Sequence, residues 1–163
     1  MKKIDLGQTI AILANLGVIA SLIFVGVQVQ QGATATRSAT VLQIKDAWVQ
    51  LNLAAATSVE LADATQAIAE QGWNDATNRD RTLVTAFYRT LFHNWSNAYY
   101  QYQNDTLDEN QWGAFVREAR VSLENPNIRR VWADWNYIYD DSYRELMDGL
   151  IAEVDIGPGS PPD

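Results

Sequence analysis

Residues 10–29 read IAILANLGVIASLIFVGVQV, and the rest of the chain is organised around this apolar stretch. It contains no charged residue and no proline. A helix of this length extends about 30 Å, which matches the hydrocarbon thickness of a bilayer. We therefore interpret the stretch as a transmembrane helix that anchors the polar, acidic remainder of the chain to a membrane.

Two other interpretations of the apolar stretch stay open. A cleaved signal peptide has a basic start, which Lys2 and Lys3 provide, and residues 33–35 (ATA) have the composition of a cleavage site. Against it, Asp5 lies in the basic region, and the apolar run is long for a signal peptide. A buried core helix is the other interpretation, although such a helix normally carries a polar face.

Small residues recur along the anchor, and Asn15 lies among them. Small side chains allow two membrane helices to approach closely, and a buried amide favours a hydrogen-bonding partner. This pattern predicts self-association or docking to another membrane protein, unless it only reflects how common small residues are in membrane helices. The residues predicted to form this face are Gly7, Ala11, Ala14, Asn15, Gly17 and Ser21.

The composition describes one acidic domain behind the anchor. The chain has 163 residues, a formal net charge of -8 and no cysteine. An acidic surface repels phosphate backbones, so nucleic acid is not expected as a partner, and the absence of cysteine excludes disulfides and thiol chemistry. We divide the chain into a leader and transmembrane helix (1–32), a helical bundle domain (33–155) and a flexible tail (156–163).

Apolar residues recur at three- and four-residue spacing through the domain, which predicts helices and no sheet. The longest predicted helix spans residues 77–104 and carries an aromatic stripe that we expect at the centre of the core. The short connections between helices predict antiparallel neighbours. We therefore expect an all-α fold, in which the transmembrane helix precedes an up-and-down helical bundle. The stripe is Val84, Tyr88, Phe92, Trp95, Tyr99 and Tyr102.

Capping signatures predict where these helices begin and end. Three segments combine a hydroxyl residue with a glutamate three positions later, which predicts Thr57, Thr106 and Ser142 as N-caps. Asn125 followed by Pro126 predicts another helix start. Gly72 is expected to end the helix before it.

Two segments together carry a family resemblance. Residues 27–31 (VQVQQ) leave the apolar helix, and residues 92–102 (FHNWSNAYYQY) precede residues 107–112 (LDENQW). This combination resembles a largely uncharacterised family of small bacterial proteins with an N-terminal membrane helix and an all-helical, aromatic-rich domain. Members often carry an arginine in the glutamine-rich exit of the membrane helix, which would favour a cytoplasmic domain. Here Gln30 and Gln31 stand without one.

The resemblance implies a bacterial inner-membrane protein, and we expect its domain on the cytoplasmic side. The basic residues themselves do not set an orientation. Lys2 and Lys3 flank one end of the anchor while Arg37 and Lys45 flank the other, so the positive-inside rule gives a tie.

No catalytic, cofactor-binding or metal-binding motif is evident. The chain has one histidine, His93, whereas metal sites need several converging ligands. The sequence contains no phosphate-binding loop, dinucleotide-binding fingerprint or nucleophile elbow. We therefore expect no cofactor and no enzymatic activity.

A polar stripe on the longest helix is a candidate ligand pocket. Arg89 and His93 would contact an anionic group there, and the alternative is a solvated face or one hydrogen-bonded to a neighbouring helix. The stripe comprises Arg89, His93, Asn97 and Tyr100.

A second cluster combines arginine with tryptophan, which is the composition of protein-interface hot spots. The spacing predicts that one of the two tryptophans is partly exposed. The alternative is that both lie in the core, with the arginines paired to carboxylates. The cluster comprises Arg129, Arg130, Trp132 and Trp135.

From these features we expect a non-enzymatic role in assembly, either as a homo-oligomer or as an accessory subunit of a larger membrane complex. A membrane-tethered ligand-binding or sensory domain is the alternative.

Overall fold

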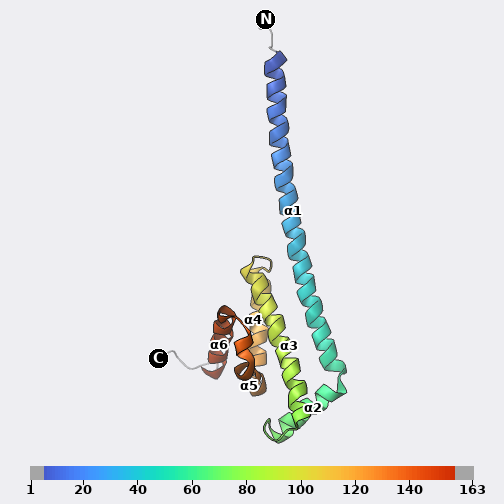
Figure 1. The fold of residues 1–163 in the computed structure, drawn as a ribbon, viewed down its shortest axis with the longest axis vertical. Coiled ribbons are helices and arrows are strands. Elements are labelled where there is room, and N and C mark those ends of the chain that lie inside the picture. Colours follow the sequence, from blue (N-terminus) through green and yellow to red (C-terminus); the bar gives the residue numbers. More distant parts are fainter. Residues whose placement is uncertain (1–5, 157–163) are drawn as a thin grey trace. The chain divides into compact units, whose positions relative to one another are not determined.

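The computed structural model describes residues 6–156, and within them the chain is all-α, as predicted, with no strand (Figure 1). Residues 1–5 of the predicted leader and residues 157–163 of the tail predicted at 156–163 lie outside these residues, whereas Ile156 belongs to the last helix. The elements are α1 (Leu6–Thr57), α2 (Val59–Gln71), α3 (Asn78–Gln103), α4 (Glu109–Leu123), α5 (Pro126–Trp135), the short 3-10 helix η1 (Asn136–Ile138) and α6 (Asp141–Ile156).

The chain divides into two compact units, Met1–Ala39 and Thr40–Asp163, which are described separately. Helix α1 contributes to both units, because its sequence has no proline. The division falls somewhat later in the chain than the boundary predicted after residue 32.

The first unit is an apolar helix without a buried side. The large apolar side chains of residues 10–29 are between 45% exposed, at Val27, and 67% exposed, at Leu22. In the described part of the chain, α1 is the one helix long and apolar enough to cross a membrane, and its most apolar window is not buried at all. A helix that is apolar all round needs an apolar environment, which the described chain does not supply.

The second unit is built around α3. Its predicted stripe is buried, with Phe92 fully enclosed and Val84 and Trp95 almost so, whereas Tyr99 and Tyr102 are half-buried. Aromatic rings carry large apolar areas, so their burial supplies much of the driving force for folding. Phe92 lies at the centre, with ring centroids 5.6 Å from Trp95 and 5.1 Å from Trp132.

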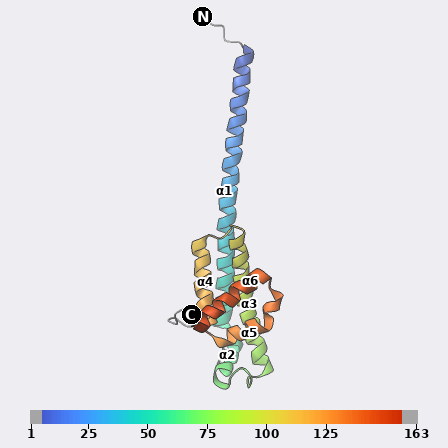
Figure 2. The same ribbon diagram turned by 90° about the vertical axis from the view of Figure 1, so that its left-hand side faces the viewer.

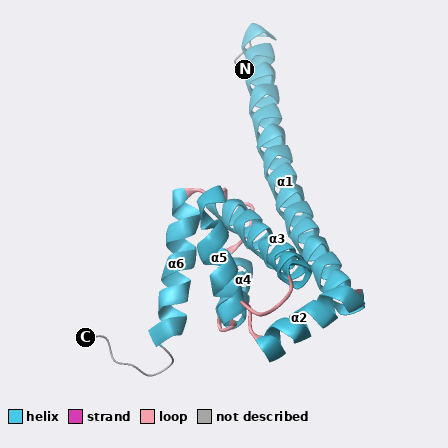
Figure 3. Ribbon diagram, turned by 60° about the horizontal axis from the view of Figure 1, so that its bottom comes forward, coloured by secondary structure: helices cyan, strands magenta, loops and turns pink. Residues whose placement is uncertain are grey.

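The helices of this unit alternate in direction around α3. The Thr40–Thr57 part of α1, α3 and α4 run antiparallel in turn, and α2 closes the end at which α1 meets α3 (Figures 1 and 3). Figure 2 shows α6 crossing the α3–α4 pair obliquely. The buried Tyr143 hydroxyl donates to the Phe92 carbonyl at 3.1 Å, which attaches α6 to α3.

Three predicted helix boundaries are confirmed. Gly72 ends α2 with φ of 86°, a left-handed conformation that favours glycine. Thr77 caps α3 by accepting from the Asp80 amide. Asn125 caps α5, with Pro126 in its first turn.

The other three predicted N-caps are wrong, because in each case a neighbouring residue caps the helix. Ser58, not Thr57, accepts from the Leu61 amide, and Asp108, not Thr106, accepts from the Gln111 amide. At α6, Asp140 accepts from the Tyr143 amide and the Ser142 hydroxyl donates to Asp140.

The rejected threonines have hydrogen bonds elsewhere. The Thr57 hydroxyl donates 2.8 Å back to the Leu53 carbonyl, and the Thr106 hydroxyl donates 2.8 Å to the Gln101 carbonyl. Such back-bonding to the preceding turn competes with capping.

Replacing Ser58 by alanine is expected to lower the free energy of unfolding by about 1 kcal/mol, because the Leu61 amide loses its acceptor. Urea denaturation followed by circular dichroism measures this loss. Thr57→Ala is the matched control and is expected to have a much smaller effect. A larger loss of unfolding free energy in Thr57→Ala than in Ser58→Ala would instead support Thr57 as the N-cap, as predicted from the sequence.

Candidate functional site

Arginine and tryptophan side chains converge where the α2–α3 loop meets the start of α3. The Arg81 guanidinium donates to the carbonyls of Trp73 at 3.3 Å and Asn74 at 2.9 Å. It also donates to the Asn78 side chain on its own helix. These bonds fold the loop back onto α3, so that Arg81 fixes the position of Trp73.

Helix α5 brings a second arginine to the same loop. Arg130 donates to the Asn74 side-chain oxygen at 2.9 Å. Its guanidinium carbon lies 5.7 Å from the centre of the Trp73 ring, within cation–π range. The loop is therefore held from two sides, by Arg81 of α3 and Arg130 of α5.

A third arginine and a second tryptophan flank an open cleft beside this loop. The Arg89 guanidinium carbon lies 3.9 Å from the centre of the Trp135 ring, and the buried Arg89 Nε has no hydrogen-bond partner. Arg81 and Arg89 line the cleft together with Trp135, and its volume is about 410 Å³. We call Trp73, Arg81, Arg89, Arg130 and Trp135 together the Arg–Trp face.

The Arg–Trp face brings three arginines together in a chain of net charge -8. Within the described residues, none of its three arginines has a carboxylate within 4 Å. Three arginines elsewhere do have ion pairs, which are Arg120 with Glu153, Arg129 with Asp155 and Arg144 with Asp141. Guanidinium groups without an ion pair can donate to carboxylates or other anions.

The structure divides the predicted Arg129–Trp135 cluster into two groups. Arg129 donates to the carbonyls of Leu123 and Glu124 at the end of α4, and Trp132 is 2% exposed. Both side chains are therefore engaged in contacts that hold the fold together. Arg130 is exposed and Trp135 partly exposed, as expected for one of the two tryptophans, and these two belong to the Arg–Trp face.

Sequence reasoning missed Trp73 and Arg81 as members of a site. The available signal was weak: Trp73 directly follows the helix-ending Gly72, and Arg81 lies two turns before Arg89 on the same helix. Only the folding of the loop against α3 and α5 brings them together.

Three residues of the predicted polar stripe contact the end of α5 or the connection to α6, each at a separate point. Arg89 stacks on Trp135, the His93 ring lies 5.2 Å from the Tyr139 ring, and Tyr100 donates to Asp140. The Asn97 side chain accepts from Gln101 at 3.4 Å. Arg89 and His93 are close enough to interact electrostatically, whereas Tyr100 and Asn97 have partners of their own.

Burial shifts the pKa values of the two groups beside Arg89. It raises the pKa of Tyr139 to about 12, which Arg89 partly offsets, and the buried Tyr139 hydroxyl has no hydrogen-bond partner. Desolvation also lowers the pKa of His93, and the nearby Arg89 charge adds to this effect. Both effects favour the neutral imidazole of His93.

Asp140 gives a pH-dependent contribution to stability. Hydrogen bonds from Ser142, Tyr100 and the Tyr143 amide lower its pKa to about 2. Because this lies below the value of about 3.9 in an unfolded chain, ionised Asp140 stabilises the fold above about pH 4. That contribution is lost as the pH falls through about 2.

The Asp140→Asn variant is therefore expected to be less stable than wild type at pH 6, with a difference that shrinks as the pH approaches 2. Urea denaturation at several pH values measures it. A difference that does not change with pH would mean that the ionised carboxylate is not what stabilises this corner.

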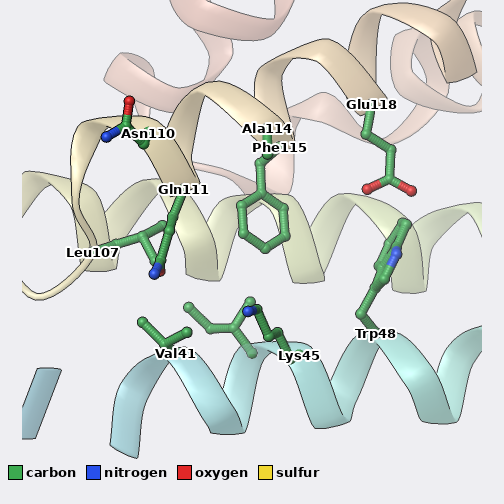
Figure 4. Close-up of a pocket in the computed structure, with 10 residues that line it drawn as sticks. Val41, Lys45, Trp48, Leu107, Asn110, Gln111, Ala114, Phe115 and Glu118 are labelled. Carbon is green, nitrogen blue, oxygen red and sulfur yellow. The ribbon is translucent and has the colours of Figure 1, made fainter. Parts of the chain in front are cut away.

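A second, apolar cleft of about 350 Å³ lies between the Thr40–Thr57 part of α1 and α4 (Figure 4). The Phe115 ring points into it, and Trp48 lies across from Glu118. The buried Gln111 side-chain oxygen has no hydrogen-bond partner, and desolvation raises the pKa of Glu118. An apolar cleft with a few polar groups is typical of small-molecule sites.

The predicted association face of the anchor is exposed throughout. The Ser21 hydroxyl donates to the Gly17 carbonyl at 2.8 Å, so it is satisfied within its own helix. The close approach of a second helix at this face is therefore not opposed by an unsatisfied hydroxyl. The exposed residues are Gly7, Ala11, Ala14, Asn15, Gly17 and Ser21.

Across residues 6–156, no three histidine, cysteine, aspartate or glutamate side chains lie close enough to hold a metal ion. No protein-family model, curated protein or solved structure matches the chain. What the described residues establish is the class of fold: an all-α protein in which one apolar helix near the N-terminus is exposed.

Proposed function

We propose that this is a single-pass membrane protein whose helical domain has a non-enzymatic role in assembly. The domain forms either a homo-oligomer or an accessory subunit of a larger membrane complex. The observation that carries the proposal is the uninterrupted exposure of the apolar side chains of residues 10–29. Such a surface on a soluble chain would drive aggregation, whereas a bilayer satisfies it.

Two surfaces support a role in assembly. The face around Asn15 and Gly17 offers close contact to another helix within the membrane. Outside the membrane, the Arg–Trp face offers guanidinium groups without an ion pair in the described chain and partly exposed indole rings. By the resemblance noted above, we place the protein in a bacterial inner membrane with its domain in the cytoplasm.

Native mass spectrometry of the full-length protein, extracted from its own membrane in mild detergents, tests this proposal. We expect a defined homo-oligomer, or a mass that includes a second protein. A partnerless monomer under every mild extraction would contradict a role in assembly. Release of the protein by an alkaline wash alone would contradict integral membrane insertion.

The cleft of Figure 4 favours a second candidate, a membrane-tethered ligand-binding domain. The unpartnered Gln111 oxygen would accept a hydrogen bond from a largely apolar small molecule. Under this candidate, native mass spectrometry would detect a small-molecule adduct on wild type. Ala114→Phe, which fills the cleft, would remove it. An adduct that persists in this variant would exclude the cleft as its site.

A further inference from the structure

We infer that the Arg–Trp face binds an acidic, extended segment of a partner protein, in which two carboxylates about four residues apart flank an apolar side chain. This inference rests on the proposed role in assembly, for which it specifies the chemistry of the partner.

The charge of the face selects an acidic partner. Arg81, Arg89 and Arg130 have no carboxylate within 4 Å in the described part of the chain, although acidic residues outnumber basic ones twenty to twelve overall. A ligand with carboxylates would supply the missing anions and form charge-assisted hydrogen bonds. The remaining acidic surface would repel such a segment elsewhere and so restrict it to this face.

The spacing of the arginines sets the spacing of the carboxylates. Arg81 and Arg89 lie eight residues apart on α3, which corresponds to about 12 Å along the helix. An extended chain covers that distance in about four residues. A segment with carboxylates at that separation matches the spacing of the two helix positions, Arg81 and Arg89, whose side chains line the cleft.

The tryptophans indicate a protein rather than another polyanion. Trp135 holds the Arg89 guanidinium against its ring and is itself only partly buried, as is Trp73. Stacking limits the motion of the guanidinium, so less side-chain freedom is lost on binding. Exposed indole surface beside arginine is typical of protein-interface hot spots.

Nucleic acid and lipid surfaces fit the face less well. Nucleic-acid binding needs a broad positive surface, whereas here three arginines lie on a chain of net charge -8. A flat lipid surface would contact only the rim of the cleft. A peptide with an apolar side chain between its two carboxylates could place that side chain against Trp135, which lines the cleft, so the cleft favours a peptide.

Fluorescence anisotropy with a labelled peptide tests the inference on full-length protein in nanodiscs of zwitterionic lipid. The probe is Glu-Ala-Leu-Ala-Glu with neutral ends, and the same peptide with glutamine in place of glutamate is the control ligand. We expect saturable binding of the acidic peptide that weakens as salt rises, and no binding of the neutral peptide.

Arg89→Gln removes one of the two arginines that line the cleft and is expected to raise the Kd of the acidic peptide about threefold to fivefold, as for a partly exposed ion pair. Arg130→Gln removes a positive charge of the face that does not line the cleft, so it is expected to raise the Kd by less, and the double variant is expected to raise it further than Arg89→Gln alone. Arg117→Gln removes an exposed arginine of α4 outside the face and should leave the Kd unchanged. Arg81 is not substituted, because it also holds the α2–α3 loop. Circular dichroism confirms that each variant is folded.

Several results would overturn the inference. They are absence of binding at millimolar peptide, equal binding of the neutral peptide, and an equal loss of affinity in Arg117→Gln. Tighter binding of phosphatidylglycerol vesicles or of a single-stranded oligonucleotide, lost in Arg89→Gln, would replace the protein partner by a lipid or nucleic acid. An oligomer detected by native mass spectrometry alongside a failed peptide assay would reject this inference and leave the proposed function standing.

Discussion

Replacing Trp132 by alanine is expected to lower the free energy of unfolding of the helical domain by about 3–5 kcal/mol. The side chain is 2% exposed, and its ring centroid lies 5.1 Å from that of Phe92 and 5.4 Å from that of Tyr139. Its indole N–H also donates to Asp148 at 2.7 Å. Truncation therefore leaves a cavity at the centre of the core and an acceptor without its donor.

Urea denaturation of the full-length protein in detergent, followed by near-ultraviolet circular dichroism, measures this loss. Trp135→Ala removes the same side chain from a partly exposed position and is the matched control, with a clearly smaller expected loss. Trp132→Phe should fall between the two, because it keeps most of the ring contacts and loses the hydrogen bond. Equal losses at positions 132 and 135 would contradict the assignment of Trp132 to the core.

Replacing both Leu16 and Ile19 by arginine is expected to move the protein from the membrane to the soluble or aggregated fraction. Each arginine near the middle of a membrane helix opposes insertion by about 2.5–3.5 kcal/mol. Both side chains are more than half exposed, so the described chain has no interior that shields them or that the substitutions would disrupt. Fractionation after an alkaline wash, with immunodetection, measures the change.

Gln28→Arg is the control for this experiment. Its position is near the end of the apolar stretch, where a long basic side chain reaches the headgroup region, so the variant should remain in the membrane. If the double variant also resisted the alkaline wash, residues 10–29 would not be the element that holds the protein in the membrane.

The sequence was sufficient to predict the helices that depend on local periodicity. The aromatic residues of α3 recur at helical spacing, so only one face of that helix can point to the core. Gly72 has a backbone conformation that other residues rarely adopt. At each of the three wrong N-caps, a polar residue one or two positions away caps the helix instead. At two of them the predicted threonine already donates to an earlier carbonyl, a tertiary or local choice that the spacing of residue types does not reveal.

The candidate site was predictable only in part. Arg130 and Trp135 were recognised by their composition, whereas Arg129 and Trp132, in the same short segment, have structural positions. Which side of α5 faces the core depends on its packing against α3 and α6. The contribution of Trp73 depends on a loop that folds back through hydrogen bonds to Arg81, and such tertiary contacts leave no periodic signal in the sequence.

Cysteine labelling of residues 10–29 tests the central claim, membrane anchoring, most directly. The chain has no cysteine, so single substitutions report on single positions. In permeabilised native membranes we expect Asp63→Cys, at an exposed position of α2, to react readily with a polar maleimide. Ser21→Cys should stay unlabelled until detergent dissolves the bilayer. Equal labelling of Ser21→Cys in intact membranes, or a mature chain whose mass lacks residues 10–29, would contradict the anchor.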